Sequence, residues 1–145
     1  MAVTAKIFGK FFLSALNKEL DLDTDTIKAM LVTSSWTPDQ DSHQYKSDVT
    51  NEVVGTGYTA TGQALTGVAV TYSAGTNTIK IDANDPSWPT STLTARYLVY
   101  YVSTPATDAT RPLISYVDFG ADVTTTSGTF TDTIDAAGIM TITVA

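Results

Sequence analysis

Residues suited to catalysis are few and far apart in this 145-residue chain. It has one histidine, His43, and no cysteine. A Ser–His–Asp site needs an oriented histidine beside a nucleophile, and His43 stands in a polar stretch with no nucleophile elbow nearby. The lack of cysteine excludes thiolate nucleophiles, disulfides and Cys-ligated zinc. We therefore expect no active site built on histidine or cysteine.

Paired carboxylates are the remaining catalytic possibility, because two of them can hydrolyse a glycosidic bond. The candidates lie in turn-like stretches of an acidic protein, where carboxylates are ordinarily solvated. The chain has no P-loop, and its Gly55-x-Gly57…Gly62 pattern lacks the spacing of a dinucleotide-binding motif. We expect a protein that is not an enzyme and needs no cofactor. The carboxylates considered are Asp82, Asp85, Asp118, Asp122, Asp132 and Asp135.

The alternating aspartates of Asp21–Asp25 are similar to the start of a calcium-binding loop. The similarity ends at the sixth position, where Thr26 replaces the glycine that makes the sharp turn. At the twelfth position Val32 replaces the bidentate glutamate. We therefore expect a solvated connection and no metal site.

Composition limits the possible partners. The net charge of −7 and the isoelectric point near 4.3 remove the electrostatic attraction that dominates nucleic-acid binding. No run reaches the roughly 18 apolar residues of a membrane span, and the N-terminus does not have the pattern of a signal peptide. Charged residues make up only 16%. A surface rich in threonine and poor in charge is common in proteins packed against other proteins.

The N-terminal stretch has the apolar period of an amphipathic helix. We predict a helix over about residues 4–20, with Thr4 as N-cap and a hydrophobic staple between Val3 and Phe8. Its apolar arc, which includes Phe11 and Phe12, covers more than half of the circumference, and one sheet contact needs only about 100°. The excess is consistent with a second apolar contact or with deep burial in the domain itself.

Strand-like segments follow, separated by turn residues about every ten positions. This pattern predicts a mainly β fold in one domain, residues 1–145, with strands from about 26 to 144. The architecture expected is an antiparallel β-sandwich or partly open barrel with one N-terminal α-helix. The strands predicted are Ile27–Thr33, a hairpin of Val68–Tyr72 with Thr78–Ile81, Thr94–Ser103, Leu113–Phe119, and a last hairpin of residues 130–134 with residues 140–144 around a turn at residues 136–138.

Two long polar segments, residues 34–48 and 82–91, carry large aromatic side chains. Such side chains either anchor an interface or fold back as a lid over the core, and for Trp36 the lid is favoured. The residues predicted to contact a partner are Phe11, Phe12, Trp36, Tyr45 and Trp88.

The order of several blocks resembles a family of small structural proteins of tailed bacteriophages. These blocks are AKIFGKFFLSALNKELDLDTDTIKAMLVTSSWTPDQDSHQY, GTGYTATGQAL, SWPTSTLTARYLVYY, RPLISYVDFGAD and FTDTIDAAGIMTITVA. The resemblance implies a virion protein, first of all a capsid decoration or cement protein. Such a protein binds the outer face of the major capsid protein and forms homo-oligomers on the particle. The alternatives are a tail, neck or adsorption component, or a glycan-binding module. No catalytic, cofactor or metal residue is implied.

Overall fold

The computed structural model describes residues 2–145. Strands account for 45% of the chain and helical turns for 9%, in two antiparallel sheets with one α-helix and, among the described residues, no closed barrel. The predicted fold class is therefore confirmed. The elements are β1 (Thr4–Ile7), α1 (Lys10–Leu16), β2 (Ile27–Val32), η1 (Lys46–Asp48), β3 (Gln63–Ala64), β4 (Ala69–Ser73), β5 (Thr78–Asp82), β6 (Ser87–Val102), η2 (Asp108–Thr110), β7 (Leu113–Thr131) and β8 (Met140–Thr143).

The larger sheet has five strands in the order β1-β7-β6-β2-β3. Its central strands are apolar on both faces, as the alternation of side chains requires for a sheet covered on two sides. In β2, Ala29 and Leu31 belong to one hydrophobic cluster, whereas Met30 and Val32 belong to a second cluster on the opposite face. The sheet therefore separates two cores.

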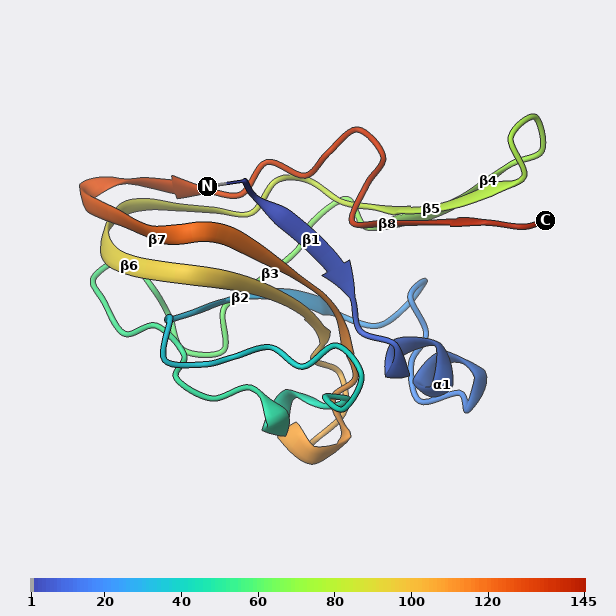
Figure 1. The fold of residues 1–145 in the computed structure, drawn as a ribbon, viewed down its shortest axis with the longest axis horizontal. Coiled ribbons are helices and arrows are strands. Elements are labelled where there is room, and N and C mark those ends of the chain that lie inside the picture. The colour runs from blue at the N-terminus through green and yellow to red at the C-terminus, as the bar shows by residue number, and fades with distance from the viewer. Residues whose placement is uncertain (1) are drawn as a thin grey trace.

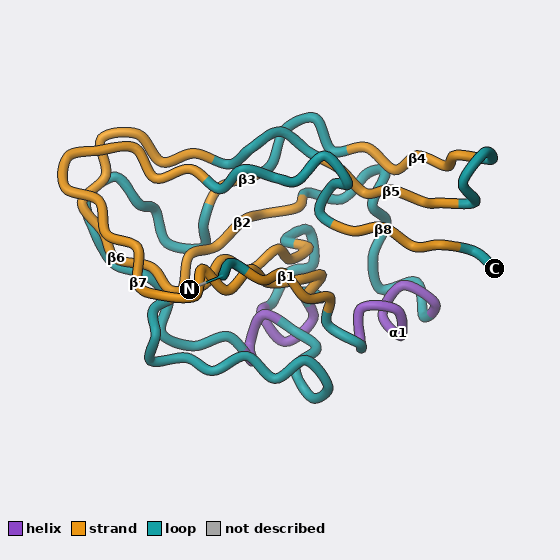
Figure 2. Tube along the Cα trace, turned by 45° about the horizontal axis from the view of Figure 1, so that its top comes forward, coloured by secondary structure: helices purple, strands orange, loops and turns teal. Residues whose placement is uncertain are grey.

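A long bent hairpin of β6 and β7 builds much of the sandwich. Both strands run along one layer, curl together and return in the other layer, as Figures 1 and 2 show. The curl coincides with register shifts between Trp88 and Ser91 and between Ala95 and Tyr97. Bulges increase local twist, and Pro89 lies within the first shift, where a missing N–H is tolerated. The polar segment of residues 82–91, for which a loop was expected, is therefore a strand from Ser87 onward.

The smaller sheet has the order β4-β5-β8 and extends beyond the rest of the molecule (Figures 1 and 2). We call these three strands the arm. The predicted hairpin of residues 68–81 is confirmed as β4 and β5. The predicted last hairpin is wrong, because Phe130 pairs with Trp88 inside β7 and β6, while β8 pairs with β5. Strands far apart in the sequence pair here in place of the predicted local hairpin.

The N-terminal prediction is wrong in its boundaries. Residues Thr4–Ile7 form a strand on the edge of the larger sheet, with Thr4 opposite Asp118 and Ile7 opposite Ser115. The helix begins only at Lys10 and ends at Leu16, and it has no side-chain cap. Thr4 is therefore not an N-cap, and no staple forms. Hydrogen bonds to β7 pair one side of the backbone of residues 4–7, and β1 thereby becomes the outer strand of the sheet beside β7.

The second core lies under the long segment between β2 and β3. Phe8, Tyr101 and Leu113 are fully buried there beneath that segment. The segment returns to the sheet at Gly62, where φ is +76° and an added Cβ would collide with the carbonyl oxygen of Ala29. Glycine is needed at this position for both reasons. The close approach holds β3 against β2.

Candidate contact surfaces

Three of the five residues predicted to contact a partner lie inside the protein. Phe11, Trp36 and Trp88 expose only 3–4% of their surface. Phe12 remains 40% exposed, and Tyr45 is partly exposed. Because Phe11, Trp36 and Trp88 are buried within the chain, almost none of their surface is available to a partner. Contacts by Phe12 and Tyr45 stay a prediction.

Trp36 is a lid over the second core, as the sequence favoured. Its indole stacks on His43 at 5.6 Å between ring centroids and meets Tyr97 edge-on at 5.6 Å. Its Nε1–H donates a hydrogen bond to the carbonyl oxygen of Asp48 at 3.1 Å, which satisfies the buried donor. His43 in turn accepts a hydrogen bond from the backbone N–H of Asp39 on Nδ1. The single histidine is thereby used in holding the segment over the sheet.

Trp88 and Tyr45 also make contacts within the chain. Trp88 packs edge-on against Phe130 at 5.9 Å, inside the first core. The Tyr45 hydroxyl donates to Glu19 Oε2 at 3.0 Å, and burial together with this carboxylate raises the pKa of Tyr45. The bond ties the segment after α1 to the segment before η1.

The exposed apolar surface is concentrated on α1. Phe12, Leu13 and Leu16 expose 40%, 50% and 84% of their surface and lie within two turns of the helix. Phe11 points inward from the same helix and holds it on the first core, and its ring meets that of Phe12 edge-on at 5.4 Å between centroids. We call Phe12, Leu13 and Leu16 the α1 patch. It corresponds to the excess of apolar arc seen in the sequence.

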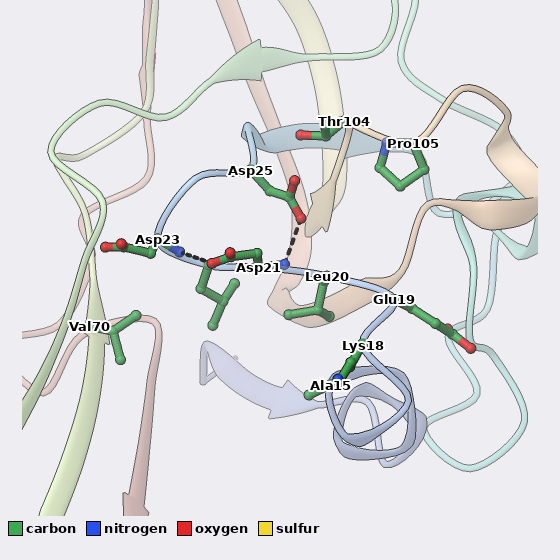
Figure 3. Close-up of a pocket in the computed structure, with 11 residues that line it drawn as sticks. Ala15, Lys18, Glu19, Leu20, Asp21, Asp23, Asp25, Val70, Thr104 and Pro105 are labelled. Atoms are coloured by element: carbon green, nitrogen blue, oxygen red, sulfur yellow. Dashed lines mark hydrogen bonds between the residues drawn. The ribbon is translucent and has the colours of Figure 1, made fainter.

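A groove of about 770 Å³ lies between the end of α1 and the arm. Figure 3 shows Ala15 and Leu20 on one side and Val70 of β4 on the other, with aspartates on the connecting loop. Two of these aspartates accept hydrogen bonds from the loop itself: Asp21 Oδ1 from the N–H of Asp23, and Asp25 Oδ2 from the N–H of Asp21. The first of these bonds is an Asx turn, and the second closes the loop from its other end.

Carboxylates elsewhere are engaged with neighbours and not gathered in a site. Arg96 donates to both oxygens of Asp118, at 2.7 and 3.3 Å, and lowers the pKa of that carboxyl. Lys80 pairs with Asp82 at 2.9 Å and lowers its pKa. Within residues 2–145, no three Asp, Glu or His side chains are grouped as metal ligands would be.

Among the carboxylates of residues 2–145, Asp132 is the one that is buried, and it is paired with Tyr100. The hydroxyl of Tyr100 donates to Asp132 Oδ2 at 2.5 Å, beside a cavity of about 300 Å³ between β1, β7 and the segment before β8. Burial raises the pKa of Asp132 and raises that of Tyr100. No second carboxylate shares this hydrogen bond, so the arrangement is that of a satisfied core pair. Asp85, which the sequence grouped with Asp132, accepts a hydrogen bond from the N–H of Ile134, and after burial its charge is a further cause of the raised pKa of Asp132.

Sequence reasoning missed the apolar face of the arm. Val70 and Tyr72 of β4 are opposite Ile81 and Ile79 of β5, so these side chains share one face. Ile81 is buried in the core, whereas Tyr72 near the tip is 59% exposed. The alternation in the hairpin signalled the face, but the sequence did not indicate that the sheet would extend beyond the core.

Comparison with known proteins found no match among family models, curated proteins or solved structures. No helix in the described part of the chain is long and apolar enough to span a membrane.

Proposed function

We propose that this chain is a structural protein of a tailed-phage particle, and that it decorates and stabilises the outer surface of the capsid shell. The observation that carries the proposal is the α1 patch. Three large apolar side chains stand in a short helix, Phe12, Leu13 and Leu16, and the chain leaves them in solvent. The block order described above supplies the phage context.

The α1 patch has the chemistry of an interface centre. Burying exposed apolar surface yields about 25 cal/mol per Å², and a few aromatic or aliphatic anchors supply most of the binding energy at an interface. Phe12 is supported from behind by the buried Phe11, so a partner would meet a preorganised side chain. A rigid fold that presents apolar anchors suits adhesion to a repeating surface.

The net charge of the chain is compatible with a position on the outside of a capsid shell. The chain carries a net charge of −7, which would oppose packaged DNA and not interfere with binding to the outer face of the shell. Aspartates border the groove next to α1 and remain close to solvent. We expect the major capsid protein to meet the α1 patch with apolar side chains and to surround it with polar or basic ones.

The glycan-binding alternative gains no support from the two tryptophans. Carbohydrate-binding surfaces commonly use exposed aromatic rings, and the polar segments of residues 34–48 and 82–91 carry Trp36 and Trp88. Both tryptophans are buried in the two cores. A tail, neck or adsorption role uses the same kind of adhesive patch, so location on the particle separates it from decoration.

Deletion of the gene from the phage tests the proposal. Particles that lack the protein are expected to assemble and to release DNA at lower temperature or under milder osmotic shock than wild-type particles. Complementation with the wild-type gene should restore resistance. Heads of unchanged resistance combined with defective tails or adsorption would replace decoration by the tail alternative.

A further inference from the structure

Strand β4 is an open edge of the arm. It pairs with β5 on one side, and within the described residues its backbone makes no hydrogen bond to any other strand on its outer side. All five residues, Ala69–Ser73, are exposed. An exposed strand edge is a template for a further strand, because its free N–H and C=O groups point outward.

This edge has none of the usual protections against pairing. Edge strands of monomeric proteins are commonly blocked by lysine, proline, a bulge or a covering loop. None of residues 67–79 is charged and none is proline. The register between β4 and β5 runs without a shift from Ala69 opposite Asp82 to Ser73 opposite Thr78. The edge is therefore regular, neutral and accessible.

We propose that β4 pairs in antiparallel fashion with β4 of a second copy of this chain, about a two-fold axis at Thr71. In this register Val70 lies opposite the partner's Tyr72, and Thr71 opposite the partner's Thr71. Pairs of a β-branched with an aromatic residue, and of two threonines, are favourable cross-strand pairs. The sequence of Ala69–Ser73 is thus self-complementary in the isologous contact that two-fold symmetry requires.

Charge favours a second copy as the occupant of this edge. Two chains of net charge −7 repel each other wherever their acidic surfaces meet. Residues 67–79 of the arm carry no charged side chain, although Lys80 of β5 lies opposite Thr71, and the arm extends away from the main body (Figure 1). Copies can therefore approach there with the least repulsion. A basic partner protein would find no acidic side chain on β4 itself, and the aspartates of the groove lie across from Val70.

The contact is small and its strength should be modest. Strands of five residues form an interface well below the standard size, which corresponds to dissociation constants from about the micromolar to the millimolar range. Such a contact becomes effective when copies are held close together on one surface. Pairing through β4 is expected of the isolated chain and does not depend on the capsid role.

Cysteine cross-linking tests the register, since the natural chain has no cysteine. At the two-fold axis the two Cα atoms of residue 71 would be about 4.5–5.5 Å apart, which is within the range of a disulfide. The variant Thr71→Cys is expected to form a disulfide-linked dimer under mild oxidation. The control Thr141→Cys, on the opposite edge of the arm, should stay monomeric. Equal cross-linking of both variants, or none at position 71, would overturn the proposal.

Sedimentation equilibrium supplies an independent readout without oxidation. Thr71→Lys places two lysines opposite each other and should raise the dimer dissociation constant about tenfold. An equimolar mixture of Thr71→Lys and Thr71→Glu should restore association, because residue 71 is its own partner. Far-ultraviolet circular dichroism verifies that each variant is folded. A wild-type chain that stays monomeric up to about 1 mM, or a lysine variant that associates normally, contradicts the pairing.

Discussion

The five-stranded sheet and the arm are both built from strands with apolar side chains. Those side chains are buried in the larger sheet, whereas many of them are exposed to solvent in the arm. In the larger sheet, both faces of β2 and of residues 97–102 of β6 are covered, and residues such as Leu98 and Tyr101 are fully buried. In the arm, burial ends at Ile81 and Met140, and the strands continue outward with exposed side chains such as Tyr72. Alternation alone therefore specifies a strand and a face, but not what covers that face.

The difference separates the residues that maintain the fold from those available for contacts. A residue over the larger sheet is surrounded by the chain itself, so its replacement acts on stability. A residue of the α1 patch or the arm tip has solvent beside it, so its replacement should act on association. Matched substitutions in the two regions test this division.

The largest expected effect distinguishes the two adjacent phenylalanines of α1. Phe11→Asp should leave little folded protein at 25 °C, because an unpaired charge would be buried in the first core at a cost above about 4 kcal/mol. Phe12→Asp should remain folded, since Phe12 is already 40% exposed. Urea unfolding followed by circular dichroism measures both. Similar stability of the two variants would show that the two side chains are not divided between core and surface.

Glycine substitutions give the next largest contrast. Gly62→Ala should lower the free energy of unfolding by about 2 kcal/mol or more, because φ is positive and the added Cβ meets the backbone of Ala29. Gly75→Ala at the arm tip meets no atom within 4 Å and should change stability by less than about 1 kcal/mol, in either direction. Thermal unfolding of both variants tests this. A larger loss of unfolding free energy in Gly75→Ala would indicate that other residues pack against the arm tip.

The smallest effect is a dependence of stability on pH from the buried pair of Tyr100 and Asp132. Burial raises the pKa of Asp132 in the folded chain above its ordinary value near 3.9. As pH rises from about 4 through the raised pKa, the unfolded chain ionises first, and wild-type protein loses stability relative to Asp132→Asn. Below about pH 4 the difference between the two proteins should be constant. Urea unfolding between pH 3 and pH 8 measures it, and an Asp132 that stabilises the fold increasingly with pH would reverse the sign.

Sequence patterns predicted the parts of the fold that depend on local alternation. The strand of residues 27–33 and the core of β6 are short apolar runs, the hairpin of residues 68–81 alternates around a turn, and each is present. The helix of residues 4–20 failed because the same apolar residues fit an edge strand followed by a short helix. Pairing with β7, more than 100 residues away, decided between these structures. Local periodicity does not contain that information.

The five predicted contact residues include both buried and exposed side chains, for a similar reason. Tryptophan in a polar segment is consistent with both an anchor and a lid, and only the position of the segment over the sheet shows that Trp36 is a lid. The surplus apolar arc of the first helix did indicate exposed residues, but the exposed ones include Leu13 and Leu16, which were not among the predicted contacts. Which residues of an arc face outward depends on how the helix sits on the core.

Binding of purified protein to shells that lack it tests the central claim most directly. Wild-type protein, incubated with particles of the deletion phage and sedimented, is expected to bind saturably, in copies comparable in number to the shell subunits. Leu16→Asp should weaken binding at least about tenfold, whereas Val54→Asp, at a valine that is 97% exposed outside the α1 patch, should bind as wild type does. Absence of binding, saturation at a few copies, or equal binding by the Leu16 variant would contradict decoration through the α1 patch.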